Sequence, residues 1–365
     1  MAGSTLGTIF KITTWGESHG RGIGVVIDGC PAGLALKEED IQVYLNRRKP
    51  GQSQYTTPRK EDDSVEILSG VFGGKTTGCP ISLMVLNENQ LSRDYSEIAG
   101  YYRPGHADFT FDEKYGFRDY RGGGRSSGRE TIGRVAAGAV AAKLLKELGV
   151  TVTVYTKSIG PVSIQSFDPE AVYGNPLYMP DADAAKQAQD YLNDCMRNKD
   201  SCGGIIECQI LGLPTGIGDP VFEKLDANLA KAILSIGAVK GFEIGDGFAA
   251  AISRGSTNND SFFYGSQGKI QKRTNHSGGV LGGISDGDSI VFRAAIKPTP
   301  SISSLQTTVN KSGEDISVSI KGRHDPVIVP RAVVVVESMA ALTVLDGLLL
   351  NMAANIQGIY DFYHK

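Results

Sequence analysis

The N-terminal part of the chain alternates between apolar and polar positions in a way that predicts β-strands. β-Branched and aromatic residues in 7–15 predict a strand that breaks at 16–20, and 23–27 predicts a second strand. His19 therefore lies in a tight connection between two predicted strands. Other predicted elements are strands at 65–68 and 81–86 and a mixed-charge helix at 37–48.

A helix is predicted directly after the glycine- and arginine-rich run at 120–130. Ser127 and Glu130 have the spacing of a capping box, in which two side chains and two backbone N–H groups bond reciprocally at a helix start. Apolar residues then recur at helical spacing up to Gly149, which predicts a helix packed inside the protein. This apolar face consists of Ile132, Val135, Ala136, Ala139, Val140, Leu144 and Leu148.

The remainder of the chain adds further strands and helices and one long apolar segment. Residues 150–235 contain a polar helix near 181–199 and predict a more peripheral part without a catalytic constellation. Residues 333–354 are apolar enough for either a buried strand end or a helix. Since neither a fixed-period repeat nor an interdomain linker is apparent, we expect a single domain over 1–365 of the α/β class.

The run at 120–130 has the features of an anion-binding loop. Consecutive glycines at 122–124 permit backbone conformations that expose N–H groups, and Arg121, Arg125 and Arg129 supply charged, forked donors. The predicted helix points its positive end toward the same place. The alternative interpretation is a flexible glycine turn with solvated arginines.

Basic charge is concentrated locally, because the whole chain carries 37 Lys+Arg against 40 Asp+Glu for a formal net charge of −3. A broad nucleic-acid surface normally makes the whole domain basic, so a small, multiply anionic ligand is the better hypothesis and no nucleic-acid partner is expected. The clustered arginines are Arg118, Arg121, Arg125, Arg129 and Arg134.

Composition indicates a folded globular protein, with 41% hydrophobic and 21% charged residues. No apolar run is expected to reach the length of about 18–20 residues that spans a bilayer, and no signal peptide is apparent, so we expect a cytoplasmic protein without membrane contact. The 5 cysteines form no CxxC pair and no zinc-type spacing, which predicts reduced thiols and no metal site.

Two common nucleotide-binding motifs are absent. Gly123 and Gly128 have P-loop spacing, but Arg129 and Glu130 stand where Lys and Ser/Thr are required, so ATP-type chemistry is not expected. The glycines within 278–283 lack the GxGxxG spacing between a strand and a helix, which argues against a classical dinucleotide fold.

Scarce histidines and one aspartate are candidates for acid–base chemistry. His19 and His106 lie in glycine- or proline-bounded breaks, where catalytic groups are common, although a loop histidine is also often exposed or structurally hydrogen-bonded. Asp325 follows His324 and has two further interpretations besides a catalytic base. It could equally cap the next element or pair with Arg323.

Several ordered segments together resemble the chorismate synthase family. Its three signature segments resemble residues 16–31, which begin GESHG, residues 124–131 (GRSSGRET), and RHDP at 323–326 followed by Glu337 and Ser338. Residues 103–108 (RPGHAD), 297–301 (KPTPS) and the glycines at 278–283 resemble further family segments. The similarity covers essentially the whole chain.

The resemblance implies conversion of 5-enolpyruvylshikimate 3-phosphate to chorismate and phosphate, a lyase reaction and the last shared step toward aromatic compounds. It is an anti-1,4-elimination of the C3 phosphate and the C6 hydrogen that requires reduced FMN without net redox change. The substrate carries two carboxylates and a phosphate, which suits the local arginine excess.

The resemblance also implies roles for individual residues. His19 would protonate the departing phosphate, His106 would lie near the N1 and O2 edge of the flavin, and Asp325 near its N5. Ser18 and Ser127 would orient these groups. Substrate binding would fall to Arg48, Arg103, Arg129 and His19.

The flavin contacts of the family fall on a larger set of residues. Relatives often have Asn at the position of Gly237 and Arg at the position of Gln54, so this chain lacks a side-chain amide and one of two arginines assigned to NADP binding. Arg48 alone therefore makes an NADP role doubtful. The implied FMN contacts are Arg125, Ser126, Ser127, Gly237, Ala238, Gly282, Lys297, Pro298, Thr299, Pro300, Ser301 and Arg323.

For the architecture, the resemblance implies a β-α-β sandwich with helices between antiparallel-rich sheets, long glycine-rich active-site loops, and a homotetramer. A separate flavin reductase is an implied partner, and NADPH would serve only if the chain reduces its own flavin. Two alternatives stay open on the residues alone: a flavin oxidoreductase that consumes NAD(P)H, and a phosphate- or RNA-binding module that uses the arginine run.

Overall fold

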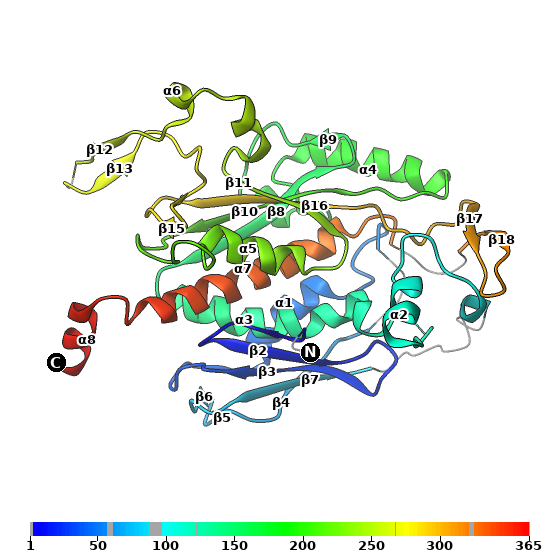
Figure 1. Cartoon of the computed structure of the whole chain (residues 1–365), viewed down its shortest axis with the longest axis horizontal. Coiled ribbons are helices and arrows are strands. Elements are labelled where there is room, and N and C mark those ends of the chain that lie inside the picture. The colour runs from blue at the N-terminus through cyan, green and yellow to red at the C-terminus, as the bar shows by residue number, and fades with distance from the viewer. Residues whose placement is uncertain are drawn as a thin grey trace.

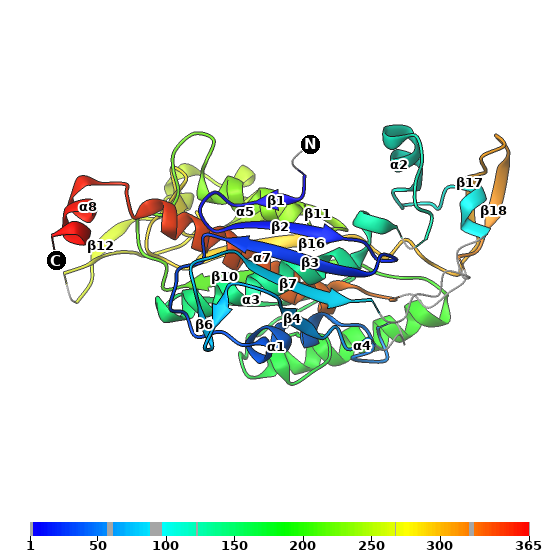
Figure 2. The ribbon, with the colours of Figure 1, turned by 90° about the horizontal axis from the view of Figure 1, so that it is seen from below.

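Two five-stranded antiparallel sheets enclose a layer of helices in the computed structural model of this protein (Figure 1), which describes residues 3–56, 61–87, 97–121, 123–266, 268–320 and 325–364. The first sheet has the strand order β1-β2-β3-β7-β4. Its strands are β1 Thr5–Leu6, β2 Lys11–Gly16, β3 Gly22–Asp28, β4 Val65–Ile67 and β7 Ile81–Leu86. Figure 2 shows β2, β3 and β7 side by side across the helix layer.

Alternation of side chains explains how this sheet faces the helices. In β7 the residues Ile81, Leu83 and Val85 are buried while the residues between them are partly exposed, which is the pattern of a strand with one face on a core. The β2–β3 register pairs Thr14 with Val25 and Gly16 with Ile23, so the His19 connection closes a hairpin. The predicted strands at 7–15, 23–27 and 81–86 are confirmed within a few residues.

The second sheet has the order β11-β16-β10-β8-β9 and is also antiparallel. Residues 150–235, expected to be more peripheral, provide β8 and β10 in this sheet, and Val154, Ile206 and Cys208 are fully buried. Part of that stretch therefore lies in the core. The strands are β8 Thr151–Ile159, β9 Val162–Ser163, β10 Gly204–Leu211, β11 Val239–Ile244 and β16 Ile290–Ile296.

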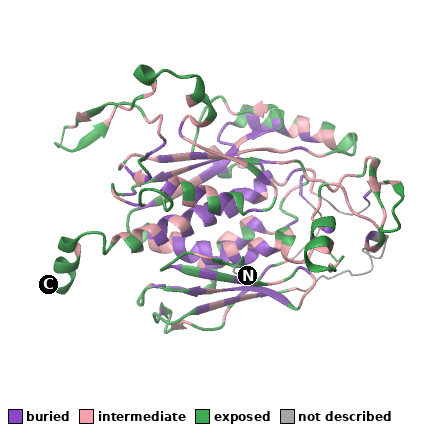
Figure 3. Ribbon diagram, in the orientation of Figure 1, coloured by how far each residue is buried: buried purple, intermediate pink, exposed green. Residues whose placement is uncertain are grey.

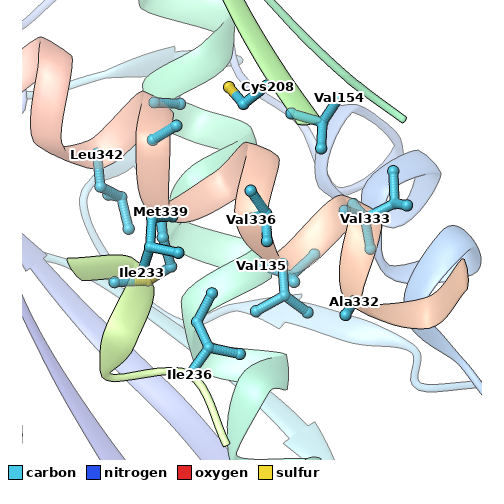
Figure 4. Packing of buried hydrophobic residues seen from close by; sticks show 14 of the residues in the cluster. Val135, Val154, Cys208, Ile233, Ile236, Ala332, Val333, Val336, Met339 and Leu342 are labelled. Carbon is cyan, nitrogen blue, oxygen red and sulfur yellow. The ribbon is translucent and has the colours of Figure 1, made fainter. Parts of the chain in front are cut away.

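Four helices fill the space between the sheets: α1 Glu38–Arg48, α3 Thr131–Glu147, α5 Leu225–Leu234 and α7 Val329–Asn351. The purple, buried segments of Figure 3 follow these helices and the sheet faces toward them. Figure 4 shows Val135 of α3 and Val336 and Met339 of α7 in one apolar cluster with Ile233 of α5. This arrangement confirms the predicted β-α-β sandwich.

α3 and α7 approach closely because small residues lie between them. A Cβ atom placed on Gly138 of α3 would lie 2.5 Å from the Cα of Ser338 in α7. An ordinary van der Waals contact needs about 3.4 Å or more, so only glycine fits at this crossing.

α7 has the length and apolar composition of a membrane span, contrary to the expectation that no apolar run reaches that length. Of its most apolar window, 67% is buried inside the protein. The helix packs against α3, α5 and β8, so its apolar character is explained by its place in the core. The segment at 333–354 is thus a helix and not a strand end.

The start of α3 differs from the predicted capping box. The Ser127 side chain accepts the N–H of Arg129 at 3.3 Å and caps the short helix η4 Gly128–Glu130. The Glu130 carboxylate instead accepts hydrogen bonds from Arg134 at 2.9 Å and from Thr14 at 3.3 Å. Glu130 therefore connects α3 to β2 through Thr14. These bonds of Glu130 take the place of the bond to the Ser127 backbone N–H that a capping box would have.

Short hairpins and peripheral helices complete the described chain. The hairpin strands are β5 Val71–Phe72, β6 Lys75–Thr76, β12 Phe262–Tyr264, β13 Ile270–Lys272, β14 Val280–Leu281, β15 Ile284–Ser285, β17 Gln306–Val309 and β18 Asp315–Val318. The helices are η2 Glu97–Gly100, α2 Asp108–Tyr115, η3 Gly124–Ser126, η5 Ala171–Tyr173, α4 Ala182–Arg197, η6 Gly247–Ile252, α6 Gly255–Asn258 and α8 Ile356–Tyr363.

Candidate active site

The loops that carry the predicted site residues gather at one end of the sandwich. Figure 1 places α2 and the β17–β18 hairpin at this end and α8 at the other. The loops come from very different places in the sequence: after β2, after α1, after β7, before α3 and before α7. Hydrogen bonds between their side chains define the site.

The His19 loop is held on both sides. Ser18 is buried, and its Oγ lies 3.2 Å from Nδ1 of His19, which orients the imidazole. The amide of Asn87, directly after β7, donates to the carbonyls of Glu17 at 2.9 Å and Gly20 at 2.8 Å. The loop is therefore clamped from the neighbouring strand, and His19 lies half-buried at its tip.

The arginine run starts with two left-handed glycines, Gly123 and Gly124, at φ 83° and 51°. Arg125 then turns back to β2, where it donates to the Gly16 carbonyl at 3.1 Å and to Thr14 Oγ1 at 2.6 Å. Ser126 is exposed and donates to the Gly123 carbonyl. These bonds place the run directly beside the strand that leads to His19.

Arg129 joins the His19 clamp to a buried carboxylate. Its Nε donates to Oδ1 of Asn87 at 3.0 Å, and its Nη1 donates to Oδ1 of Asp63 at 3.2 Å and also contacts Glu61. Asn87 thus receives Arg129 on its oxygen while its nitrogen holds the loop with His19. Residues 17–20 and 129 form one hydrogen-bonded unit.

Arg48, at the end of α1, pairs with the other oxygen of the same aspartate. Its Nη2 lies 2.7 Å from Oδ2 of Asp63, and its Nη1 donates to the Gly128 carbonyl at 3.1 Å. The Arg48 side chain is 2% exposed and that of Asp63 0%. Burial lowers the pKa of Arg48, and the Asp63 charge opposes that shift.

Asp325 is connected to this group through Arg331 of α7. Arg331 Nη1 donates to Oδ2 of Asp325 at 2.6 Å, and its Nε donates to the backbone carbonyl of Arg48 at 3.0 Å. The sequence suggests that Asp325 could pair with Arg323. Arg323 lies outside the described part of the chain. His324 also lies outside it.

His106 is held as a neutral imidazole. Its Nδ1 lies 2.9 Å from the Pro104 carbonyl and its Nε2 lies 2.9 Å from Oγ of Ser301. Because a carbonyl only accepts, Nδ1 carries the hydrogen and Nε2 accepts from Ser301. Burial, with the Arg103 and Lys297 charges, lowers the pKa of His106 to about 4.

Arg103 is occupied within its own loop. Its guanidinium makes two bonds of 2.8 Å to the buried carboxylate of Asp108, and its backbone N–H donates to the same group at 3.0 Å. Asp108 starts α2, so this pair fixes the turn that presents His106. The geometry explains Arg103 as a loop anchor, and its binding of substrate stays a prediction.

Two of the segments predicted to contact flavin, those around Ala238 and Lys297, meet beside His106. Lys297 donates its Nζ to the Gly105 carbonyl at 2.8 Å and its N–H to the Ala238 carbonyl at 2.9 Å. The hydroxyl of Thr299 is buried and has no hydrogen-bond partner among the described residues, which fits a segment built to meet a polar ligand. Pro298 is exposed and Pro300 half-buried.

One glycine of this region leaves space. A Cβ at Gly237 would meet no atom within 4 Å, so this position is open. Gly282, at φ 63°, is also open, but its β14–β15 hairpin adjoins Ser289 before β16, at the opposite end of that strand from Lys297. Ala238 adopts φ 72°, an unusual left-handed conformation for a residue with a Cβ. With Thr299, the features of Gly237 and Ala238 fit a planar polar ligand such as a flavin.

Two further predictions have plain structural outcomes. Gln54 is exposed and donates to the hydroxyl of Tyr55 at 2.7 Å. Arg323, predicted to contact FMN, lies outside the described residues.

Each arginine of the predicted anion-binding cluster has a protein partner in the structure. Arg118 pairs with Asp112, Arg121 with Asp119, and Arg134 with Glu130. Arg125 bonds β2 and Arg129 pairs with Asp63, as described above. The charges of Arg118, Arg121 and Arg134 are balanced by carboxylates close to them in the sequence, and that of Arg129 by Asp63, which is distant along the chain.

Sequence reasoning missed the three residues that connect the site: Asp63, Asn87 and Arg331. Asn87 directly follows a predicted strand, a common place for site residues, and this position was an available signal. Asp63 and Arg331 have no such local signal, since their importance comes from partners far along the chain.

Comparisons with known proteins agree on one family. The family model described as chorismate synthase matches residues 10–349. The chorismate synthase of Agathobacter rectalis is 70% identical over 367 residues and that of Lachnoclostridium phytofermentans 68% over 367 residues, each with 100% of both chains covered. A crystal structure of chorismate synthase superposes with a TM-score of 0.76 at 31% identity, covering 98% of this chain and 97% of that chain.

Proposed function

This chain belongs to the chorismate synthase family, and we propose that the loops joined by Asp63, Asn87 and Arg331 form its active site. The reaction is the final shared step of the shikimate pathway, in which 5-enolpyruvylshikimate 3-phosphate loses phosphate and a hydrogen to give chorismate. The single observation that carries the site is the continuous chain of hydrogen bonds from the His19 loop through Arg129 and Arg48 to Asp325.

His19 acts as the general acid. Departure of phosphate from carbon develops negative charge on the bridging oxygen, and a proton from an imidazole lowers that barrier. The bond between Ser18 and Nδ1 orients the ring, and Asn87 keeps the loop in place. Arg48 and Arg129 stabilise the same developing charge.

Asp325 and His106 act on the opposite side of the reaction. Asp325 would lie near N5 of the flavin and assist removal of the C6 hydrogen, and Arg331 fixes the orientation of its carboxylate. His106 would lie near the N1 and O2 edge of the flavin, with its ring oriented by Pro104 and Ser301. Ser127 Oγ accepts the backbone N–H of Arg129 and so supports that residue. Arg103 holds the turn with His106 through its bonds to Asp108.

Reduced FMN is the cofactor that the family requires, and it supplies transient electron density to the substrate without net oxidation. Its proposed contacts are the described residues at 125–127, 237–238, 282 and 297–301, together with Arg323. The unpartnered hydroxyl of Thr299 and the open position at Gly237 support the part of this placement beside Lys297.

The cellular setting is proposed from the family alone. We infer a cytoplasmic homotetramer that acts on a small molecule and receives reduced flavin from a separate reductase. NADPH would be a direct substrate only if this chain reduces its own flavin. The NADP role of Arg48 and Gln54 stays doubtful, because Gln54 stands where relatives often have an arginine.

An anaerobic assay with chemically reduced FMN tests the function. The enzyme should release phosphate and form chorismate in equal amounts, and His106→Ala and Asp325→Ala should lose much more turnover than substrate affinity. His364→Ala is the matched control, because His364 is exposed near the C-terminus. Absence of chorismate from the parent enzyme, or NAD(P)H consumption without phosphate release, would contradict the proposal.

A further inference from the structure

Asp63 is the one residue that contacts both Arg48 and Arg129 through its side chain among the contacts described above. It lies on the segment between α1 and β4, adopts φ 49°, and has a side chain that is 0% exposed. A fully buried carboxylate needs compensating donors, and here each oxygen faces a different guanidinium.

The two pairs are distinct in geometry. Oδ2 of Asp63 lies 2.7 Å from Nη2 of Arg48, and Oδ1 lies 3.2 Å from Nη1 of Arg129. Other donors of the two arginines point elsewhere: Nη1 of Arg48 donates to the Gly128 carbonyl, and Nε of Arg129 donates to Asn87. The carboxylate therefore sets the spacing between two guanidinium groups that come from different helices.

We propose that Asp63 is a positioning residue that holds Arg48 and Arg129 as a fixed pair and lowers their attraction for anions, so that phosphate leaves the site readily. This inference rests on the proposed role of the two arginines in binding the phosphorylated substrate. The inference gives a function to the Asp63 carboxylate. A negative charge would otherwise be unexpected in a site for a substrate with two carboxylates and a phosphate.

Charge and geometry make separate contributions to this role. A neutral Asn at position 63 would leave two neighbouring, largely buried cations without their shared counter-charge, and an added phosphate would then be held more tightly. The same change would remove one strong acceptor and loosen the spacing of the guanidinium groups. Turnover, which depends on their exact placement, would fall.

Glu61 does not replace Asp63 in this scheme. It contacts Arg129 from the same segment, and no contact between it and Arg48 is found among the described residues. An arginine pair held only through Glu61 would have Arg48 without its carboxylate partner. Asp63 alone thus couples the end of α1 to the helix start at Arg129.

The test is Asp63→Asn in the full-length enzyme, assayed anaerobically with reduced FMN and with inorganic phosphate as the probe of anion affinity. We expect kcat to fall by about 10-fold to 100-fold. The inhibition constant for phosphate should also fall, by about 10-fold, which means that phosphate binds more tightly while turnover becomes slower. A structural defect alone would not tighten phosphate binding.

Two variants complete the experiment. Asp181→Asn is the matched control, since Asp181 is also a buried carboxylate but accepts backbone N–H groups of Gln165, Ser166 and Ala184 at the start of α4. It should leave both constants unchanged. Asp63→Glu keeps the charge and lengthens the side chain, so kcat should fall while phosphate inhibition stays at the parent value.

The outcomes separate this inference from the proposed function. If the parent enzyme forms chorismate, Arg48→Ala and Arg129→Ala impair it, and Asp63→Asn changes neither kcat nor phosphate inhibition, the inference about Asp63 is wrong. If Asp63→Asn does not fold, parent-like turnover of Asp63→Glu would overturn it instead. No chorismate from the parent would reject the proposed function itself.

Discussion

His106 should resist protonation until the pH is far below the ordinary range of histidine. In the neutral ring its Nδ1 donates to the Pro104 carbonyl and its Nε2 accepts a hydrogen bond from Ser301. Protonation would place a cation in a partly buried position near Arg103 and Lys297. Burial, followed by these charges, lowers the pKa from 6.5 to about 4.

The magnitude follows from the difference between the folded and unfolded pKa values. Because the folded value is the lower one, the stabilisation is fully present above pH 6.5 and is lost as the pH falls from 6.5 through about 4. The full shift corresponds to about 3 kcal/mol, and the loss between pH 7 and pH 5 to about 2 kcal/mol.

Two measurements check this prediction. The C2 proton of His106, followed by NMR in the ligand-free enzyme and assigned with His106→Gln, should titrate with a midpoint near pH 4. In urea unfolding, the free energy of the parent should decrease by about 2 kcal/mol more than that of His106→Gln between pH 7 and pH 5. A midpoint above pH 6, or equal pH dependence in the two proteins, would refute the reasoning.

Two further predictions concern the core and the acid side of the site. Gly138→Ala should destabilise the protein by up to about 2 kcal/mol, because overpacking against Ser338 costs about 1–3 kcal/mol and better helix propensity returns about 1 kcal/mol. A higher urea midpoint than that of Gly100→Ala, whose added Cβ meets no atom within 4 Å, would contradict this. Arg331→Ala should lower kcat at least about 10-fold by freeing Asp325, with partial recovery in Arg331→Lys; parent-like kcat in Arg331→Ala would remove Arg331 from its positioning role.

Much of the fold was predictable because its elements have local signals. The alternation in 81–86 and the apolar periodicity after Ser127 correspond to β7 and α3. The packing of these elements was not predictable from pattern, since the contact between Gly138 and Ser338 depends on two helices almost 200 positions apart. The β-α-β arrangement therefore came from the family resemblance and not from periodicity.

The site shows the same division between local and distant information. His19, His106 and Asp325 were expected from glycine- or proline-bounded breaks, which mark loops at strand and helix ends. Asp63 and Arg331 had no comparable mark, because a single charged residue in a loop resembles ordinary surface. Their roles exist only through side-chain bonds to residues distant in the sequence.

The charge of the arginine run illustrates why local composition overstates an electrostatic site. The attraction of basic residues for an anion depends on how much of their charge is left after pairing with the protein's own carboxylates. Arg118, Arg121 and Arg134 are each paired with a carboxylate. Arg129 shares Asp63 with Arg48. Binding of a trianion at this pair therefore competes with a buried carboxylate. This competition favours a ligand with several acidic groups over a single small anion. The additional acidic groups make contacts elsewhere in the site, and these offset the weaker attraction at Arg48 and Arg129.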